Sequence, residues 1–490
     1  AIMLGGPGAV FWMWMVGLFG MAIKTTEVTL SMIYRNTDNP ENPHGGPMFV
    51  AAKAFGEMGL GGLGKAIGGI FVITLLISTI TGGNMFQAWN VADITHAYFD
   101  VPQIAVGIIL AVLVGLVIIG GIKRIGAVAG RLVPFMCAIY LLAAVYVIVL
   151  KLGVIPEIFK LIFVEAFSPT DATGAFLGGT AGYALLWGMK RALFSSEAGQ
   201  GSSPIAHSAA KTDEPVREGV VAGLEPFIDT LVVCTLTALV ILSTGLWSRG
   251  PDVAFVNAPA VAQSADGTWT LERVEVTPGD ETPTSGAEVF AVVVAEENPN
   301  TGKNLHRVMG RVVVEPDGED ARYFIEWGAS PTARQQFTLH STGAWFNHQG
   351  ATLTAKAFDS VTPGLGKWLV TLAAWLFAIS TMISWSYYGE QGVVFLFGEK
   401  LVLPYKVVYC LLIVVAAIPQ LISTDAQLDN LTALGTGVML WANIPIMLIF
   451  GNKAMKAYHI YVGKLKRGEF KTEEHEPASI SDVMEGKDIK

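Results

Sequence analysis

The sequence has few charged residues for its length, since only 15% of its 490 residues are Asp, Glu, Lys or Arg whereas 52% are hydrophobic. A soluble protein of this size cannot hide so large an apolar fraction in one core. Its three cysteines, Cys137, Cys234 and Cys410, all lie inside long apolar runs, so their placement does not indicate a disulfide framework. The composition therefore indicates an integral membrane protein.

Sequence motifs of enzymes are also missing. The chain contains no Walker loop, no cluster with the spacing of metal ligands and no nucleophile next to a general base. We therefore expect a protein that is not an enzyme, that carries no cofactor and that binds no nucleic acid. The sequence does not indicate an oligomeric state.

Apolar runs long enough to cross a bilayer are abundant instead. A hydrocarbon core of about 30 Å takes roughly 20 helical residues. Runs of about this length predict nine membrane helices, at residues 10–34, 66–95, 104–121, 125–150, 174–194, 219–247, 363–388, 402–422 and 430–450.

Lys and Arg are absent from the short connections 96–102 and 423–427 but present in the loops on the other side, for example at Lys123, Arg124 and Arg131. Because cytoplasmic loops hold such residues, we expect this second side to face the cytoplasm. The first residue then lies outside the cytoplasm. This placement, and the abrupt start of the chain, lead us to expect a further helix before residue 1.

Residues 248–361 depart from the membrane pattern. They contain short β-like runs such as "AEVFAVVVAEE" and "ARYFIEWG", separated by Pro, Gly, Asp and Asn. We expect a small β-rich domain outside the membrane and the cytoplasm. The predicted organisation is a first part of a transmembrane bundle (1–247), the inserted domain (248–361), a second part of the bundle (362–451) and a cytoplasmic tail (452–490).

The stretch "RALFSSEAGQGSSPIAH", residues 191–207, follows directly on an apolar helix. Irregular backbone at membrane depth is tolerated only where protein or a water-filled cavity supplies hydrogen-bond partners, and transporters use such breaks as binding sites. We interpret the segment from Gly188 to Ser203 as a helix break of this kind. The alternative is a helix that ends at the cytoplasmic surface and continues as a loop.

Polar side chains inside two other predicted helices favour the interpretation of this segment as a helix break. Asn84 and Gln87 are three residues apart and share a helix face, while Ser380, Thr381 and Ser384 lie together in a third segment. Hydroxyl oxygens are hard ligands of the kind that sodium prefers. The alternative is a packing face of small residues, which Ser and Thr also favour.

Acidic residues are rare inside the predicted helices. Glu225 and Asp229 are one turn apart, and an intramembrane carboxylate is a functional candidate by default. Asp229 is equally suited to satisfying the loosened backbone at 188–203. We assign no role to Lys24 and Glu27 in the first predicted helix.

Five motifs, taken together and in this order, resemble the alanine/glycine:cation symporter family of the amino acid/polyamine/organocation superfamily. They are "HGGPMFV", "GGNMFQAWN", "RALFSSEAGQGSSPIAHSAAKTDEPVREG", "EPFIDTLVVCTLTALVI" and "SWSYYGEQGVVFLFG". The resemblance implies an all-α polytopic membrane fold with a five-plus-five inverted repeat, of which most of the first broken helix is missing here. It also implies that 248–361 is an insertion, since most relatives have a short loop there.

The resemblance further implies a function: a secondary active symporter that couples sodium entry to uptake of alanine and glycine by alternating access, in the multi-pass setting of a bacterial plasma (inner) membrane. The expected partners are sodium, a small neutral amino acid and the lipid bilayer, with no other metal ion. The expected cation ligands are Ser380, Thr381 and Ser384. The expected substrate contacts are Gln87, Asn84, Gly188, Phe194, Thr381 and Trp385. The expected coupling or gating residues are Glu197, Glu225 and Asp229.

Two alternatives remain open at this point. Protons can replace sodium, with Glu225 or Asp229 as the carriers. In the other alternative the protein is a membrane sensor or receptor that binds an amino acid and signals through its extra domain or tail.

Overall fold

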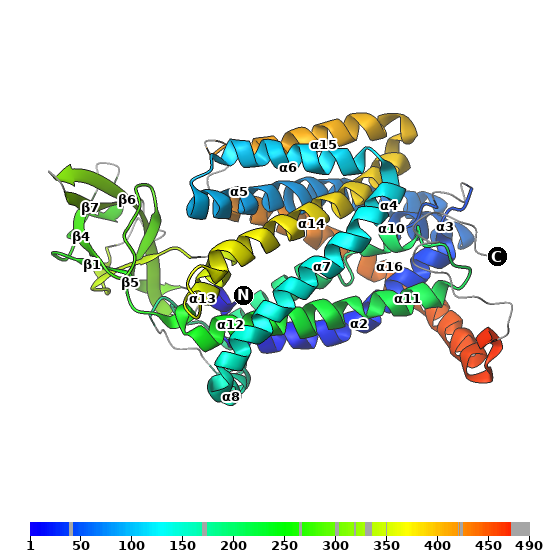
Figure 1. Ribbon diagram of the computed structural model, residues 1–490. Helices are drawn as coiled ribbons and strands as arrows, with labels where there is room; N and C mark the ends of the chain where they lie inside the picture. The colour runs from blue at the N-terminus through cyan, green and yellow to red at the C-terminus, as the bar shows by residue number, and fades with distance from the viewer. Residues whose placement is uncertain are drawn as a thin grey trace. The chain divides into compact units, whose positions relative to one another are not determined.

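The computed structural model describes residues 1–38, 43–168, 174–263, 267–298, 303–317, 320–328, 336–348, 350–419, 421 and 425–471 (Figure 1). Helices dominate. The α-helices are α1 (Ile2–Gly5), α2 (Gly8–Tyr34), α3 (Pro47–Glu57), α4 (Gly61–Ile80), α5 (Phe86–Phe99), α6 (Gln103–Ile118), α7 (Gly121–Leu150), α8 (Ile155–Glu165), α9 (Ala181–Ser196), α10 (Ser203–His207), α11 (Pro215–Gly223), α12 (Cys234–Thr244), α13 (Gly350–Asp359), α14 (Leu365–Phe397), α15 (Val402–Ala416) and α16 (Asp425–Arg467).

Two segments are π-helical and extend neighbouring α-helices: η1 (Thr81–Met85) joins α4 to α5, and η3 (Phe227–Val233) precedes α12. Short 3₁₀ turns complete the helical elements at η2 (Leu152–Val154), η4 (Leu246–Ser248), η5 (Glu399–Leu401) and η6 (Glu469–Lys471). Because π-turns interrupt the regular hydrogen-bond ladder, they often mark functional positions.

Six helical segments of the described chain are long and apolar enough to cross a membrane: Gly8–Tyr34, Gly61–Phe99, Gly121–Leu150, Pro215–Thr244, Leu365–Phe397 and Asn430–Arg467. A helix also lies over each of the three remaining predicted crossings. These are α6, α9 and α15, with 16, 16 and 15 residues. The protein is therefore a multi-pass membrane protein, while the inverted repeat stays a prediction.

Two boundaries differ from the sequence-based expectation. The helix expected at 174–194 begins only at Ala181, after a short non-helical segment. The helix α16 continues through the predicted start of the tail at residue 452 as far as Arg467. Residues 472–490 of that predicted tail lie outside the described residues, and the domain boundaries stay predictions.

The chain forms two compact units, which we describe separately. One comprises residues 1–13, 147–191 and 235–363; the other comprises residues 14–146, 192–234 and 364–490. In the second unit, α4, α14 and α15 share a core that includes the fully buried Phe71, Leu75, Met382, Tyr387 and Tyr409. Glycines with positive φ, Gly364 (86°) and Gly398 (77°), delimit α14.

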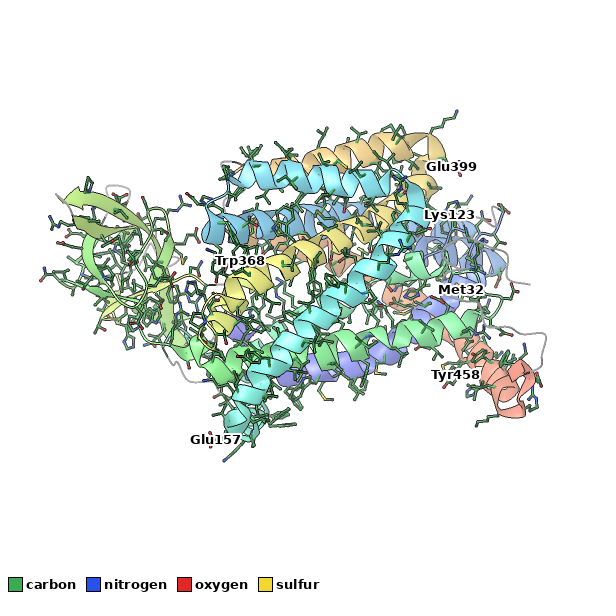
Figure 2. The ribbon with its side chains drawn as sticks, viewed as in Figure 1. Met32, Lys123, Glu157, Trp368, Glu399 and Tyr458 are labelled. Carbon is green, nitrogen blue, oxygen red and sulfur yellow. The ribbon has the colours of Figure 1, made fainter. Side chains whose placement is uncertain are left out.

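Many large apolar side chains are exposed on the outer faces of the helices. Leu116, Leu142 and Trp368, for example, are 62%, 72% and 67% exposed, and Trp368 lies in the first turn of α14 (Figure 2). Such exposure is unfavourable in water but is what a lipid-facing surface requires.

The first unit contains an antiparallel barrel. Its strands are β1 (Val253–Phe255), β4 (Val274–Pro278), β5 (Glu288–Asn298), β6 (Lys303–Asp317), β7 (Asp320–Trp327) and β9 (Gly343–Phe346), and β8 (Thr338–Leu339) adds to β5. The order β6-β7-β4-β1-β9-β5 returns to β6 through the β5–β6 pairing, so the sheet closes on itself. A separate hairpin pairs β2 (Val261–Gln263) with β3 (Trp269–Leu271).

The barrel interior is filled by alternate residues of its strands. Val276, Val289, Val312 and Ile325 belong to one buried cluster. The expected β-rich region also contains a helix that sequence reasoning did not identify, α13, in which Leu353 and Phe358 are buried.

Candidate functional site

The break in the helix pattern begins at the end of α9. Helical structure stops at Ser196 and resumes with α10 at Ser203. Between them, Glu197, Gly199 and Gly201 have φ values of 53°, 82° and 81°, in the left-handed region that residues other than glycine rarely adopt. The backbone is therefore irregular from Glu197 to Ser202, as both the helix break and the loop predict, and the irregular part starts well beyond the predicted Gly188.

Gly188 lies in the intact part of α9. A Cβ atom added there would be 2.4 Å from the carbonyl oxygen of Ala9 and 2.7 Å from the Cβ of Trp12. Close packing of α9 against the start of α2 accounts for a glycine at this position. A substrate contact for Gly188 stays a prediction.

Lys24 of α2 lies beside the end of α9. Its side chain is fully buried, and its Nζ donates a hydrogen bond to the carbonyl oxygen of Ser196, at 2.7 Å. The same Nζ is 3.0 Å from Oε2 of Glu225, which lies between α11 and η3 and whose side chain is 40% exposed. A cation here is favourable because the last carbonyls of a helix lack backbone donors and carry negative partial charge.

Glu27, one turn further along α2, contacts the middle of the break. The amide of Gly199 donates to Oε1 of Glu27 at 3.2 Å. Asn443 of α16 donates from Nδ2 both to Oε2 of Glu27 and to the carbonyl oxygen of Gly199, each at 2.9 Å. All of these groups are buried, so they replace the water that the backbone at Gly199 would otherwise need.

Glu197 is the first residue of the break. Its Oε2 accepts a hydrogen bond from the hydroxyl of Ser202 at 2.6 Å, and its carboxylate also interacts with the side chain of Trp385 on α14. The hydroxyl of Ser203 donates to Glu225 at 3.4 Å. Two of the predicted coupling residues, Glu197 and Glu225, therefore belong to one cluster.

Asp229 lies in the π-helical segment η3. Its carboxylate accepts hydrogen bonds from the hydroxyl of Ser195 and, at 3.2 Å, from the hydroxyl of Thr230. It thus binds a side chain of α9 one residue before the helix ends. The contact is to a hydroxyl group, whereas we had considered a contact to the backbone of the break.

Asn84 and Gln87 lie in and just after η1. The Nδ2 of Asn84 donates to the carbonyl oxygen of Tyr409 at 2.8 Å, and its Oδ1 has no hydrogen-bond partner among the described residues. Gln87 donates from Nε2 to the carbonyl oxygen of Gly82 at 3.2 Å. Asn84 therefore ties the π-helical turn to α15 and keeps one unused acceptor.

Aromatic rings connect η1 to the break. A Cβ atom at Gly83 would be 2.3 Å from Cγ of Trp385, so the indole lies directly against the π-helical backbone. Phe194, in the last turn of α9, meets the ring of Phe86 edge to face at 6.2 Å. Trp385 and Phe194 thus approach the same two elements, η1–α5 and the end of α9.

The expected cation ligands lie on α14. The hydroxyl of Ser380 donates to the carbonyl oxygen of Phe377 at 2.8 Å, and that of Ser384 donates to the carbonyl oxygen of Ser380 at 3.0 Å. Thr381 lies between them and is half-buried. The hydroxyl oxygens keep lone pairs for a cation, but the described contacts of Ser380 and Ser384 lie within α14 or, at 3.9 Å, on the sulfur of Met136.

Sequence reasoning identified the break and its acidic residues but missed the other members of the cluster. Lys24, Glu27 and Asn443 carry most of the contacts to the irregular backbone. A signal was present for two of them, because Lys24 and Glu27 are charged residues three apart in an otherwise apolar helix. Asn443 gave little signal, since single Asn residues also occur at ordinary helix contacts.

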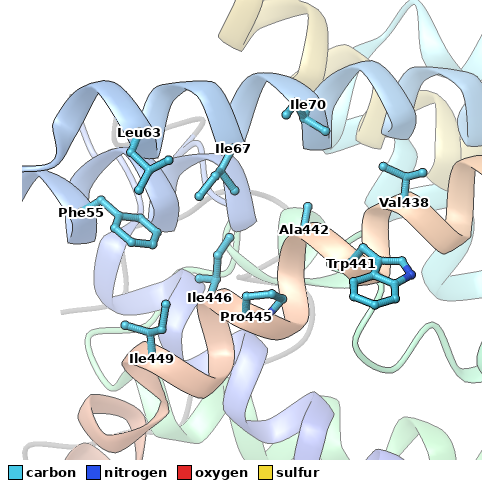
Figure 3. A pocket seen from close by; sticks show the side chains of 10 residues that line it. All are labelled: Phe55, Leu63, Ile67, Ile70, Val438, Trp441, Ala442, Pro445, Ile446 and Ile449. Atoms are coloured by element: carbon cyan, nitrogen blue, oxygen red, sulfur yellow. The ribbon is translucent and has the colours of Figure 1, made fainter.

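A pocket of about 390 Å³ lies elsewhere, between α3, α4 and α16 (Figure 3). Its lining side chains are all apolar, among them Phe55, Ile67, Trp441 and Pro445. An amino acid carries two charges and needs polar partners when it is buried. This pocket is therefore unsuited to such a ligand.

Comparison with known proteins identifies a family for most of the chain. A family model described as the sodium:alanine symporter family matches residues 1–276 and 333–476. The unmatched residues 277–332 include β5, β6 and β7.

Individual relatives give the same result. The sodium/alanine symporter AgcS of Methanococcus maripaludis is 32% identical over 84% of this chain, and the match covers 68% of that protein. The uncharacterized transporter YflA of Bacillus subtilis is 41% identical over 51% of each chain. A sodium/proton-dependent alanine carrier protein of Bacillus sp. is 26% identical over 96% of this chain and 84% of its own length. The chain thus spans about two thirds of the first relative and half of the second. The family model and the first relative together show that the chain belongs to the sodium:alanine symporter family.

Proposed function

We propose that the protein is a secondary active symporter that couples sodium entry to the uptake of alanine and other small neutral amino acids, glycine included, by alternating access. The observation that carries this proposal is the break between α9 and α10, which lies inside a membrane protein and is held by buried charged groups. Family membership and the names of the relatives support alanine and a cation as the transported pair.

The proposed substrate site lies where η1, the end of α9 and α14 approach one another. Trp385 and Phe194 form apolar walls that restrict the size of the side chain, and Gln87 and the unused Oδ1 of Asn84 offer polar contacts. A small amino acid fits such a site because bulky side chains meet the two rings. The irregular backbone of the break supplies dipoles for the charged groups of the substrate.

The proposed sodium site uses Ser380, Thr381 and Ser384 of α14, which present hydroxyl and carbonyl oxygens on one stretch of helix. Sodium is a hard cation that binds such oxygens. Binding of both ligands would close the bundle and permit the change of access.

Proton coupling is the second candidate, and one observation favours it. The ammonium of Lys24 faces three carboxylates, those of Glu225, Glu197 and Glu27. Burial of excess negative charge is costly unless a further cation or a proton neutralises it. In this candidate mechanism, one of these carboxylates or that of Asp229 carries the coupled proton.

The location follows from the same proposal. We infer that the protein lies in a bacterial plasma membrane, with the β-barrel region outside the cytoplasm. Accessibility of a single cysteine introduced at an exposed barrel position such as Glu326 to a membrane-impermeant reagent in intact cells tests this placement.

The deciding experiment is uptake of labelled alanine into proteoliposomes that carry the full-length protein, with an inward sodium gradient and then with choline at fixed pH. Accumulation above equilibrium that requires sodium supports the symporter. Accumulation that follows a pH gradient and ignores sodium supports the proton-coupled form. Alanine binding without any uptake contradicts both.

A further inference from the structure

We propose that Lys24 and Glu27 are positioning residues that fix helix α2 to the start and the middle of the break, so that α2 and the broken segment move as one body during transport. The inference deepens the proposed function and rests on it for its meaning in the transport cycle. The contacts themselves can be tested without transport.

A single stripe of α2 faces the break. Gly20, Ile23, Lys24 and Glu27 follow the spacing i, i+3, i+4 and i+7, which places them on one helix face. A Cβ atom at Gly20 would be 3.2 Å from the Cβ of Ala198, within the break. The small residue at position 20 therefore allows the two backbones to approach closely.

The same stripe reaches the next residue of the break. A Cβ atom at Gly199 would be 3.4 Å from Cγ2 of Ile23, in ordinary van der Waals contact. The polar contacts of Lys24 and Glu27 lie on either side of this apolar contact. Two turns of α2 thus cover the backbone from Ser196 to Gly199.

The charges of the two polar residues match the two backbone groups that they bind. The carbonyl oxygen of Ser196 receives the ammonium of Lys24 at 2.7 Å, and the amide of Gly199 donates to the carboxylate of Glu27 at 3.2 Å. Hydrogen bonds in which one partner is charged are stronger than those between neutral groups. The arrangement therefore satisfies one orphan carbonyl and one orphan amide from a single rigid helix.

Asn443 of α16 also contacts the break. It binds both the carboxylate of Glu27 and the carbonyl oxygen of Gly199, so that α2, the break and α16 meet at one point. A movement of α2 together with the break relative to α16 then separates Asn443 from both Glu27 and Gly199. The two contacts of Asn443 are therefore the ones that we expect to open and close during transport, while the contacts of α2 to the break persist.

A simpler role for Lys24 is to form a stabilising ion pair with Glu225. The two roles predict different behaviour when the charges are exchanged. The double variant K24E/E225K restores the attraction between the two side chains, but a glutamate at position 24 cannot donate to the carbonyl oxygen of Ser196. An ion-pair role predicts recovery in this variant, whereas a positioning role predicts none.

The experiment compares K24Q, E27Q, K24R and K24E/E225K with the wild type in the full-length protein. The matched control is K406Q, because Lys406 forms a buried ion pair with Glu390 at 2.8 Å on α15 and α14. The first readout is hydrogen–deuterium exchange of the amides at 196–203 in detergent, which does not require transport. The second is alanine uptake, resolved into the alanine concentration for half-maximal uptake and the maximal rate.

We expect faster exchange at 196–203 in K24Q and in K24E/E225K, by roughly 10- to 100-fold, which corresponds to about 1.5–3 kcal/mol for a hydrogen bond to a charged group. K24R keeps donors for both partners and is expected to retain slow exchange. K406Q is expected to leave exchange at 196–203 unchanged. In E27Q the side-chain carbonyl oxygen still accepts from Gly199, but the new amino group faces that of Asn443, so we expect a lower maximal rate with a smaller change in exchange.

Slow exchange in folded K24Q, or its recovery in K24E/E225K, would overturn the positioning role even if the wild type transports alanine. If K24Q does not fold, an E27Q variant with wild-type exchange and wild-type uptake would overturn it as well. Failure of the proposed function has a different signature, because the wild type then shows no coupled uptake whatever the exchange data show.

Discussion

Two lysines are buried in the same compact unit of this membrane protein, and their surroundings differ. Lys406 and its partner Glu390 lie on regular helices, α15 and α14, with side chains 6% and 11% exposed. Lys24 pairs with a carboxylate that is 40% exposed and also binds the last carbonyl of a broken helix. In the first case the ion pair joins two helices that are complete by themselves. In the second it completes backbone that the helix leaves unsatisfied.

A buried charge in a membrane protein therefore has two separate uses. An ion pair between complete helices fixes how the helices pack, and its loss leaves an uncompensated charge. A charge that binds the end of a broken helix fixes an irregular backbone, where ligands can also bind. We therefore expect changes at Lys406 to affect stability first and changes at the break to affect transport first.

The largest expected effect is that of Gly201→Ala. Gly201 has a φ of 81°, and a Cβ atom there would be 2.3 Å from Cγ of Pro47 and 2.9 Å from the ring of Phe71. Backbone strain of about 1–2 kcal/mol adds to this clash. We expect little folded protein in the membrane fraction, measured by detergent extraction and size-exclusion chromatography.

The matched control is Gly437→Ala in α16, where an added Cβ meets nothing within 4 Å. It is expected to fold and transport like the wild type. Normal yield and uptake of Gly201→Ala would show that the break adapts more easily than its geometry indicates.

A direct comparison of the two ion pairs comes next. Glu390→Gln leaves Lys406 buried without a counter-charge, which costs about 3–5 kcal/mol for a fully buried pair. Glu225→Gln costs less stability because Glu225 is partly exposed and solvent screens the pair. We expect Glu390→Gln to lower the melting temperature more, and Glu225→Gln to lower alanine uptake more. If Glu225→Gln lowered the melting temperature more and Glu390→Gln lowered alanine uptake more, the proposed difference between the two ion pairs would be wrong.

The variant Thr381→Ala tests the proposed sodium site independently of the break. Loss of one hydroxyl ligand is expected to raise the sodium concentration for half-maximal uptake by about tenfold, or about 1.4 kcal/mol. Thr371→Ala on the same helix is the control, because Thr371 is buried outside the proposed site. An unchanged sodium dependence in Thr381→Ala would exclude Thr381 as a ligand.

The weakest effect that we expect concerns His348, a half-buried titratable group in the β-barrel region. Burial, followed by the positive charges of Arg249 and Lys356, lowers the pKa of His348 to about 3. The unfolded chain, with a histidine pKa of about 6.5, binds the proton first as the pH falls, so stability is lost below about pH 6.5. Between about pH 6.5 and about pH 5.5 the loss is about 1 kcal/mol.

Limited proteolysis of the β-barrel region at these two pH values measures this effect. We expect faster cleavage at the lower pH in the wild type, and a smaller pH difference in His348→Gln, which has no proton to gain. Equal pH differences in the two proteins would show that folding does not lower the pKa of His348.

Much of the fold could be predicted because lipid imposes a simple rule on sequence. Every predicted crossing coincides with a helix, since apolar runs of sufficient length have few other stable structures in a bilayer. The β-rich character of the inserted region was predictable from short β-like runs, such as "AEVFAVVVAEE", that are separated by Pro, Gly, Asp and Asn. The helix α13 was missed because its composition, "GATLTAKAFD", resembles the polar loops around it.

Less of the candidate site was predictable. The break was indicated by Gly and Ser, but its start depended on tertiary contacts, because Gly188 fits a close helix contact as well as a break. Lys24 and Glu27 stood out as charges in an apolar helix, yet nothing in the sequence indicates that they face residues 196–199. Contacts between residues 172 positions apart are decided by packing, and a single sequence does not record packing.

The closed order of the barrel bears on how such a module comes to lie within a membrane protein. Its first strand and its last pair with each other, with Val253 opposite Ala344. The polypeptide thus leaves the barrel within one strand spacing, about 5 Å, of the place where it entered. A loop between two helices can accept or lose such a module without its ends having to move apart, which makes excision of the barrel and rejoining of the flanking chain a feasible engineering step.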